Sequence, residues 1–389
     1  MKSEENWGLL DMSYKLEDIC DYVKDKIDVS VVDEHTYIST ENMIPDKGGI
    51  TEASSLPSAD KTQAFKAGDV LVSNIRPYFK KIWYATFEGG CSNDVLVFRA
   101  REGVSKRFLY YVLADDAFFT YSMATSKGTK MPRGDKKALM KYDVPNIAYD
   151  VQVKIASILD AIDNKIIVNR EINDNLLQQA QSIFTQEFLS LDSIPYGWQE
   201  SSLLGIADYL NGLAMQKYRP KDDEQGLPVL KIKELRQGSC DSNSELCSPS
   251  IKPEYIVHDG DVIFSWSGSL LVDLWCGGTC GLNQHLFKVT SSTYDKWFYY
   301  AWTNHHLQKF AAIAADMATT MGHIKREELS KAEVLIPSQS DYDRIGGLLS
   351  PLYELVIANR IENRKLASLR DELLPQLMSG QLDVSEVSL

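Results

Sequence analysis

Two long stretches of the chain place mostly apolar residues at alternating steps of three and four positions. The first runs from Ile155 to Ile183 and the second from Ile345 to Leu373. The positions are Ile155, Leu159, Ile162, Ile166, Asn169, Asn173, Leu176, Ala180 and Ile183, and then, at one constant offset, Ile345, Leu349, Leu352, Val356, Asn359, Asn363, Leu366, Arg370 and Leu373. A heptad repeat kept for about four heptads is typical of a coiled coil and restricts the possible folds more than any other feature. An amphipathic helix packed on an ordinary core is the alternative.

Two asparagines interrupt each pattern at matching places. They are Asn169 and Asn173 in the first stretch, and Asn359 and Asn363 in the second. A buried Asn lowers the stability of a coiled coil but disfavours every register in which it meets only hydrocarbon. We therefore predict that the two helices pair with each other as an antiparallel coiled coil. About 38 helical residues at about 1.5 Å each give a rod of about 55–60 Å, which would act as a spacer.

The segments that precede the two helices also repeat. Leu16–Val23 returns as Leu203–Leu210, and Gly68-Asp69-Val70 returns as Gly260-Asp261-Val262. Each Gly-Asp turn leads into an apolar run, as expected of a short strand. The offset between matching segments drifts by a few positions, which indicates that loops have changed length while the elements have not. A period that spans half of the chain indicates the duplication of a whole domain.

The expected fold is therefore of the α+β class, with a pseudo-two-fold internal repeat. Two mixed domains alternate with the two long helices. We expect the first mixed domain at residues 1–147 and a central helical region at 148–195. The second mixed domain follows at 196–338, and a C-terminal helical region at 339–389.

Composition limits the class of protein. A chain of 389 residues is longer than one hydrophobic core usually fills. Its six cysteines are too few and too irregularly spaced for a disulfide framework, and no apolar stretch approaches the roughly 20 residues of a membrane span. We expect a soluble, cytoplasmic protein. The net charge of −13 argues against nucleic acid as a partner unless basic residues gather locally.

Basic residues do gather in two places. Residues 127–141 carry six Lys and Arg residues against the single acidic residue Asp135, a net charge of +5. Arg76, Lys80 and Lys81 form a second cluster without an acidic neighbour in the sequence. A basic loop of this kind is either a phosphate-binding surface or simply a solvated face.

The layout of two variable domains and two similar long helices resembles the specificity subunits of type I restriction–modification systems. Residues 68–83 resemble the central strands of the recognition domains in that family, and residues 282–288 resemble the matching place in others. Residues 128–132 and 320–324 resemble the loop before a Leu-rich helix, and residues 373–380 resemble the usual end of the second helical region. The order and the duplication of these pieces make the resemblance specific.

The resemblance implies a subunit without catalytic activity that reads an asymmetric bipartite DNA target, with two target-recognition domains held apart by the helices. It also implies two methyltransferase subunits as partners, and restriction subunits in the full complex. The subunit itself would bind no cofactor and no metal, whereas its partners use S-adenosylmethionine, ATP and Mg²⁺. Loop amides, hydroxyls and cations can read base edges or hold phosphates. The candidate DNA-binding residues are Arg76, Lys80, Lys81, Thr129, Lys130 and Arg133 in the first copy, and Lys217, Arg219, Lys231, Lys233, Thr319, Thr320, His323 and Lys325 in the second.

Two kinds of chemical site are weaker alternatives. Asp46 together with residues 135–137 matches an acidic pair with lysine, as in some nucleases, but such short patterns arise by chance. Cys276 and Cys280 with nearby His285 invite a zinc interpretation, as do Cys240 and Cys247. The irregular spacing and the absence of counterparts in the first copy favour plain thiols. We find no phosphate loop, no Gly-rich dinucleotide turn and no Asn-Pro-Pro-Tyr-like adenine pocket.

Two further interpretations concern contacts. Asn283, Gln284 and His285 either read bases or satisfy local hydrogen bonds. A scaffold whose coiled coil binds protein and never DNA is the competing function. Apolar residues outside the heptad positions, such as Ile158, Ile167 and Phe184, are expected to dock the methyltransferase subunits.

Overall fold

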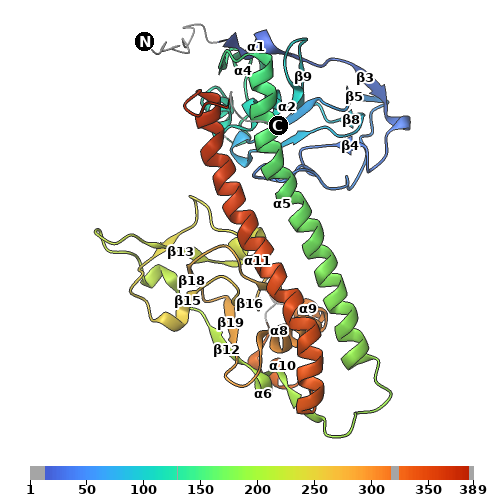
Figure 1. The fold of residues 1–389 in the computed structure, drawn as a ribbon, viewed down its shortest axis with the longest axis vertical. Coiled ribbons are helices and arrows are strands. Elements are labelled where there is room, and N and C mark those ends of the chain that lie inside the picture. Colours follow the sequence, from blue (N-terminus) through green and yellow to red (C-terminus); the bar gives the residue numbers. More distant parts are fainter. Residues whose placement is uncertain (1–13, 129, 317–323, 385–389) are drawn as a thin grey trace, which may run out of the picture. The chain divides into compact units, whose positions relative to one another are not determined.

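The computed structural model describes residues 14–128, 130–316 and 324–384, which divide into two compact units. Unit 1 holds the chain up to Asn164 and again from Ala367, and unit 2 holds Lys165–Leu366. Within the described residues each unit combines two four-stranded sheets, one two-stranded sheet and several helices (Figure 1). The predicted mixed fold with two domains is confirmed at this level.

Unit 1 contains ten short strands in the described part of the chain. Its sheets have the orders β1-β10, β2-β9-β6-β7 and β3-β5-β8-β4. The strands are β1 (Tyr14–Lys15), β2 (Cys20–Tyr22), β3 (Lys26–Asp28), β4 (Tyr37–Ile38), β5 (Lys61–Phe65), β6 (Val70–Ser73), β7 (Ile82–Tyr84), β8 (Gly89–Cys91), β9 (Val95–Ala100) and β10 (Asp143–Val144). The helices are α1 (Leu16–Ile19), α2 (Lys106–Ala114), α3 (Asp116–Ala124), α4 (Lys136–Leu139), the first part of α5 (Tyr149–Phe184) and the end of α11 (Gln339–Met378).

Unit 2 repeats this arrangement. Its sheets have the orders β11-β20, β12-β19-β16-β17 and β14-β13-β18-β15. The strands are β11 (Gln199–Ser202), β12 (Asp208–Asn211), β13 (Leu227–Leu230), β14 (Leu246–Cys247), β15 (Ile256–Val257), β16 (Val262–Ser265), β17 (Leu271–Leu274), β18 (Cys280–Leu282), β19 (Leu286–Thr290) and β20 (Glu333–Ile336). The helices are the last part of α5, then α6 (Leu203–Ile206), α7 (Ile232–Gln237), α8 (Lys296–His305), α9 (Leu307–Asp316), α10 (Arg326–Ser330) and most of α11 (Gln339–Met378).

One sheet differs between the two units at its edges. In unit 1 the strand β8 pairs parallel with β4 and antiparallel with β5, and in unit 2 the strand β18 pairs parallel with β13 and antiparallel with β15. The extra strand lies beside β5 in unit 1, where it is β3, but beside β13 in unit 2, where it is β14. The common framework has therefore been extended at opposite edges.

The two Gly-Asp turns have the same geometry. In unit 1 the Asp69 carboxylate accepts a hydrogen bond from the Lys66 amide at 2.8 Å, and Gly68 has a φ of +91°. In unit 2 the Asp261 carboxylate accepts from the His258 amide at 2.8 Å, and Gly260 has a φ of +84°. Only glycine adopts this left-handed backbone readily, so both turns keep it directly before a buried strand.

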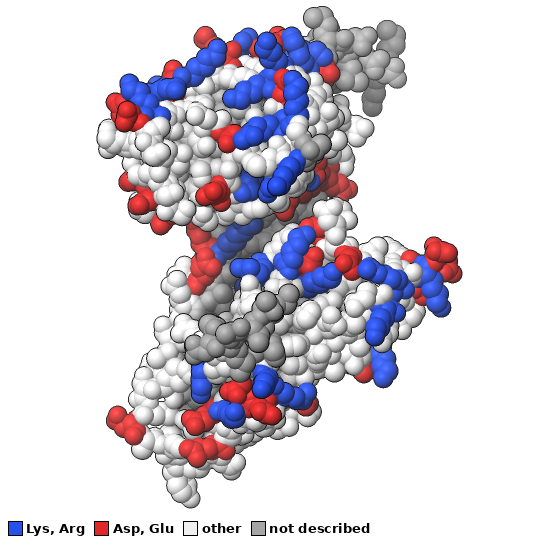
Figure 2. Space-filling model, turned by 180° about the vertical axis from the view of Figure 1, so that it is seen from behind, with Lys and Arg blue, Asp and Glu red and all other residues white. Residues whose placement is uncertain are grey.

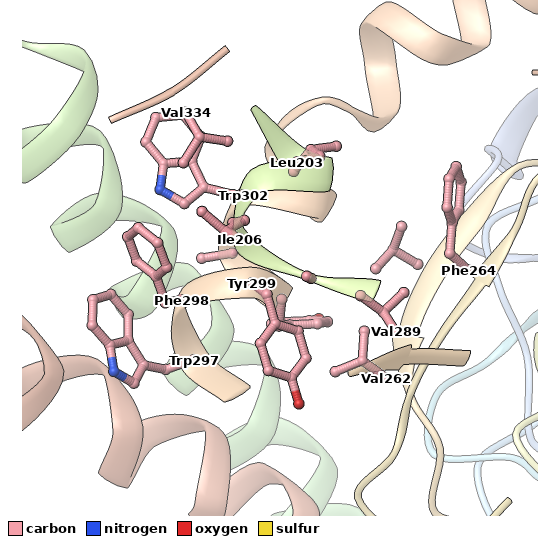
Figure 3. Close-up of a cluster of buried hydrophobic side chains, with 14 of the residues drawn as sticks. Leu203, Ile206, Val262, Phe264, Val289, Trp297, Phe298, Tyr299, Trp302 and Val334 are labelled. Atoms are coloured by element: carbon pink, nitrogen blue, oxygen red, sulfur yellow. The ribbon is translucent and has the colours of Figure 1, made fainter. Parts of the chain in front are cut away.

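Each unit has its own apolar cores. In unit 1 the largest core joins β2, β6 and β9 to α2, α3 and the ends of the two long helices. In unit 2 the corresponding core is rich in aromatic residues, and Figure 3 shows Trp302 of α8 near Leu203 and Ile206 of α6, with Phe298 and then Trp297 farther from α6. Burial of large aromatic side chains is a major stabilising term for a domain of this size.

The two long helices lie alongside each other in unit 2 and run antiparallel. Asn169 donates to the Asn363 side chain at 2.9 Å, and Asn359 donates to the Asn173 side chain at 2.9 Å. The Asn173 and Asn363 amides also donate to backbone carbonyls of the facing helix, at 3.4 and 3.2 Å. Asn pairs across the interface therefore occupy the positions at which the heptad patterns predicted them.

In unit 1 a charged network joins α2 to the ends of the long helices. The Arg107 guanidinium pairs with Asp160 of α5 and stacks on the Tyr84 ring, 4.5 Å from its centroid. The Tyr111 hydroxyl lies 2.7 Å from Asp160 and 2.9 Å from Asp163. Burial, and then the charge of Asp163, raise the pKa of Tyr111, so this hydroxyl stays protonated and donates.

The same network explains why the second heptad pattern contains a cation, Arg370. Arg370 pairs with Asp163 at 2.9 Å and with Asp371 at 2.9 Å. Its charge is compensated, so a partly buried arginine is tolerated at a position where an apolar residue is usual.

Unit 2 makes the corresponding contact with aromatic side chains. At the offset that relates the two heptad patterns, Trp297 matches Arg107 and Gly346 of α11 matches Ala156. Trp297 packs against Gly346, where an added Cβ would lie 2.9 Å from the indole nitrogen, so the tryptophan needs glycine at this position. Tyr300 packs edge to face on Tyr353, with 4.9 Å between the ring centroids.

Of the residues expected to dock partner subunits, Phe184 is buried and Ile158 is partly buried. Phe184 is 1% exposed and packs edge to face on Trp302, so it belongs to the core of unit 2. Ile158 packs against the main core of unit 1. The heptad pattern missed these contacts because the mixed domains cover apolar positions that the helix pair leaves open. Ile167 is 49% exposed, as expected.

Candidate nucleic-acid interface

Two loops that carry predicted DNA-binding residues come together in unit 1. Ile75 and Arg133 form an antiparallel bridge, and the Arg76 amide donates to the Pro132 carbonyl at 2.8 Å. Lys127 and Arg133 exchange two backbone hydrogen bonds of 2.9 and 3.0 Å, which close the 127–133 loop. The two basic clusters of the sequence therefore form one surface.

Acidic side chains from other parts of unit 1 compensate much of this positive charge. Arg133 pairs with Asp94 at 3.2 Å, and Lys80 pairs with Asp116 at 2.7 Å. Lys127 pairs with Asp135 at 2.5 Å. Burial alone would raise the pKa of Asp116, but hydrogen bonds and charge from Lys80 and Lys47 outweigh it and hold the pKa below its ordinary value. The +5 counted along the sequence thus overstates the positive potential of this surface.

Other candidates of the first copy differ in accessibility. Lys130 is exposed, and it has no acidic partner among the described residues. The Lys81 amine donates to the Thr40 carbonyl at 2.6 Å, and burial lowers its pKa. Arg76 is partly buried, and its Nε has no hydrogen-bond partner within the described residues. Figure 2 shows Lys and Arg side chains gathered on the face of unit 1 that is in view. Thr129 lies outside the described residues.

In the second copy, three of the candidate DNA-binding residues form ion pairs with two carboxylates. Glu245 binds Lys231 at 2.5 Å and Arg219 at 3.0 Å. Lys233 pairs with Asp241 at 3.2 Å. A hydrogen bond from Lys231 holds the pKa of Glu245 below its ordinary value, so this carboxylate stays charged at neutral pH. Three of the predicted phosphate-binding groups are therefore engaged in ion pairs.

The remaining candidates of the second copy are not brought into that cluster of ion pairs. Lys217 is exposed at the end of the 3-10 turn Met215–Lys217. Lys325 is exposed directly before α10. Thr319, Thr320 and His323 lie outside the described residues.

The Asn283-Gln284-His285 segment has mainly local partners. The Asn283 amide donates to the Leu230 carbonyl at 3.2 Å, and the His285 ring shares a hydrogen bond of 3.1 Å with the Ser267 hydroxyl. Sequence reasoning missed Trp266, whose indole nitrogen donates to the Asn211 side chain at 3.0 Å beside His285. The repeat of Gly68-Asp69-Val70 as Gly260-Asp261-Val262 could have indicated it, because the same offset matches Asn74 with Trp266.

In unit 2, Cys247, Cys276 and Cys280 are buried and Cys240 is partly buried. Within the described residues no three His, Cys, Asp or Glu side chains gather as metal ligands would. A hydrogen bond from Cys280 lowers the pKa of Cys240, and the same contact, followed by burial, raises the pKa of Cys280. The Cys276 thiol donates to the Leu274 carbonyl at 3.5 Å.

Comparison with known proteins assigns this architecture. The family model of the type I restriction modification DNA specificity domain matches residues 11–178 and again residues 195–370. The chain belongs to this family. The duplicated match agrees with the duplication deduced from the sequence, and the shared description favours a type I specificity subunit over a scaffold that never meets DNA.

Two curated relatives carry the same designation. The chain is 23% identical to the type I restriction enzyme MjaIX specificity subunit of Methanocaldococcus jannaschii, over 74% of this chain and 71% of that protein. It is 19% identical to the HindI specificity subunit of Haemophilus influenzae, over 95% of this chain and 99% of that protein. Both alignments extend over most of each specificity subunit.

A solved structure shares the fold. The type I restriction–modification S subunit from M. genitalium aligns with a TM-score of 0.55, at 14% identity, over 97% of this chain and 98% of that chain. Among the described residues of the present specificity subunit, no helix is both long and apolar enough to cross a bilayer.

Proposed function

We propose that this specificity subunit reads an asymmetric bipartite DNA target, with one half-site bound by each recognition domain. The observation that carries the proposal is a repeated strand framework with different loops. The loop between β6 and β7 covers residues 74–81, whereas the corresponding loop between β16 and β17 covers only 266–270. Loops of different length and chemistry on the same framework would read different bases. The proposed domains are residues 1–147 and 196–338.

The helical regions 148–195 and 339–389 are proposed to pair as an antiparallel coiled coil that sets the distance between the half-sites. The Asn169–Asn363 and Asn173–Asn359 hydrogen bonds support this proposal. Polar groups buried in an apolar interface favour the one register in which they meet. The coiled coil would then act as a spacer of fixed length.

The specificity subunit is proposed to act without catalytic residues, metal or cofactor of its own. Two methyltransferase subunits would bind along the helical regions, and restriction subunits would complete the cytoplasmic complex. Exposed apolar residues on α5, among them Ile167, Val168 and Ile172, support such a docking surface. S-adenosylmethionine, ATP and Mg²⁺ would be bound by the partners.

The test is to co-express the full chain with the methyltransferase encoded beside it, and to sequence the methylated bases of the host. We expect one bipartite motif with two different halves. The purified complex should bind a duplex with this motif more weakly as salt increases. A complex that modifies no DNA, or a binding constant that is independent of salt, would overturn the proposal.

Two substitutions refine this test at the loop surface of unit 1. The variant K130A/R133A is expected to flatten the dependence of log K on log salt by about 0.9 for each phosphate that the protein no longer neutralises. K61A is the matched control, since Lys61 lies on β5 and pairs with Asp28 at 3.5 Å. Equal slopes in all three proteins would make the 127–141 loop a solvated face.

A further inference from the structure

The loop between β6 and β7 exposes two adjacent aromatic rings. Pro77, Tyr78 and Phe79 form a single 3-10 turn, in which Pro77 is buried. The Tyr78 side chain is 49% exposed and that of Phe79 is 36% exposed, with 4.7 Å between the two ring centroids. Two large rings side by side on a loop form an apolar surface that the fold of unit 1 covers only in part, with the Lys81 amine 5.8 Å from the centroid of the Phe79 ring.

The backbone on both sides of these rings is strained. Arg76 and Lys80 have φ angles of 50°, in the left-handed region that non-glycine residues rarely adopt. Within the described residues, the only other non-glycine residues with positive φ are Asp46 and Lys47. Strain of this kind persists where the surroundings enforce it, and it gathers at functional sites.

The strained segments hold each other in place. The Asp46 amide donates to the Phe79 carbonyl at 2.9 Å, and the Lys47 amide donates to the Lys80 carbonyl at 3.0 Å. The Lys47 amine lies 3.0 Å from Asp116, which also binds Lys80. These hydrogen bonds and ion pairs hold the 74–81 loop in one conformation, so the rings need little reorganisation when a partner binds.

Several cations adjoin the rings. Lys80 and Arg133 are paired with Asp116 and Asp94, whereas Lys130 has no acidic partner among the described residues. The Arg76 amide is bonded to Pro132, so the turn adjoins the 127–133 loop with Lys130 and Arg133. Rigid apolar side chains flanked by cations are the composition that proteins use to enter the grooves of DNA and unstack a base step. An apolar partner protein would find these flanking charges unfavourable to bury.

We propose that Tyr78 and Phe79 form an aromatic wedge that inserts against a base step of the half-site bound by unit 1. This inference rests on the proposed DNA function and adds a specific mode of contact to it. The cations around the wedge hold the phosphates, while the rings stack on the bases.

Unit 2 has no counterpart of the wedge within the described residues. Its loop is the shorter segment 266–270, and its one aromatic residue, Trp266, is partly buried with the indole nitrogen bonded to Asn211. The two loops are attached alike, since the Gly134 amide donates to the Asn74 carbonyl and the Ile324 amide donates to that of Trp266. The wedge is therefore expected on one half-site only.

The experiment uses the full chain in complex with its methyltransferase, and duplexes that carry the methylated motif. 2-Aminopurine is placed at successive positions, and its fluorescence reports unstacking. We expect a rise at one step in a single half-site, besides the rise at any adenine that the methyltransferase flips out of the duplex. In Y78S/F79S the first signal should disappear while the signal of the flipped adenine remains.

DNA-binding affinities distinguish the contribution of ring stacking from that of charge. Y78S/F79S should weaken binding by roughly 5- to 100-fold without changing the salt slope, because aromatic rings displace no counterions. The matched control is Y196S, since Tyr196 is 102% exposed on the loop after α5. Y78F keeps a ring and should bind as the wild type does. If the double variant melts at a lower temperature than wild type, the single variant Y78S provides the same comparison.

The possible failures are distinct. A wild-type complex that binds the duplex with salt dependence, together with an unaltered Y78S/F79S, overturns the wedge and leaves the proposed function standing. Loss of methyltransferase binding in the variant overturns it as well, and assigns the rings to a protein contact. A wild-type complex that does not bind the duplex overturns the proposed function and the wedge together.

Discussion

At the scale of single residues, Glu245 reduces the positive charge that unit 2 presents, because it pairs with two of the candidate DNA-binding cations. Its carboxylate holds both Lys231 and Arg219. We expect E245Q to strengthen DNA binding and to steepen the salt slope by about 0.9 for each cation that becomes free to neutralise a phosphate. The hydrogen bond from Lys231 holds the pKa of Glu245 below its ordinary value. Glu245 is therefore negatively charged at neutral pH, and E245Q removes that charge. Salt titrations of the complex with its motif measure the slope.

The control for this substitution is E254Q. Glu254 pairs with Lys252 at 3.9 Å and with no predicted DNA-binding residue that the structure describes, so its loss removes the same charge elsewhere. If both variants bind more tightly by the same factor, the effect comes from net charge, and Glu245 has no special role in masking cations.

At the scale of elements, the Asn173–Asn359 pair can be tested by its effect on stability. N359A leaves the buried Asn173 carbonyl oxygen without its donor, and we expect it to lower the free energy of unfolding by about 1–3 kcal/mol. N175A is the control, because Asn175 is exposed and its side chain donates to the Glu171 carbonyl of its own helix at 2.9 Å. Urea unfolding of the full chain compares the variants. Equal stability of N359A and wild type would show that the pair does not hold the helices together.

A contact between the π-helical turn Thr185–Leu189, directly after α5, and helix α11 depends on pH. Glu187 accepts two hydrogen bonds of 2.8 Å from Arg344, and these hold the pKa of Glu187 below its ordinary value. A depressed carboxyl pKa stabilises the fold above the pKa of the unfolded chain, and this stability is lost as pH falls through the folded pKa. Arg344 is half exposed, so we expect E187Q to cost at most about 1 kcal/mol at pH 7.

The difference between E187Q and wild type should shrink as the medium is made acidic, which urea unfolding at a series of pH values measures. The control is E354Q, which removes an exposed carboxylate that accepts a hydrogen bond from Ser350. A gap between E187Q and wild type that stays constant through the acid range would contradict an electrostatic origin.

The elements differ in how far the sequence predicted them. The helices, the Gly-Asp turns and the Asn pairs follow from periodicity and from the internal repeat, which are local or recurrent signals. The partners of the cations do not, because Asp94 reaches Arg133 and Asp116 reaches Lys80 from distant parts of the sequence. For the same reason the pattern could not indicate that Phe184 is covered by Trp302.

At the scale of the whole molecule, the proposed spacer can be lengthened. An insertion of four or seven residues between Ile166 and Leu176 keeps the apolar stripe roughly in phase, and adds about 6–10 Å if it stays helical. We expect the methylated motif to keep the bases of both halves while the gap between them grows. An insertion of two residues rotates the stripe by about 200° and should abolish folding or assembly. If a variant with four inserted residues is functional and the gap between its half-sites is unchanged, the helices do not set the distance between the half-sites.

The different attachments of the two recognition domains limit how they can be exchanged during evolution. Arg107 in unit 1 needs the carboxylate of Asp160, whereas Trp297 in unit 2 needs the space that Gly346 leaves. A recombination event that moved the first domain alone into the second position would set a guanidinium against Gly346 and Ser350, where no carboxylate stands at the position matching Asp160. Productive crossovers should therefore fall inside the long helices, so that each domain travels with the stretch of helix on which it rests.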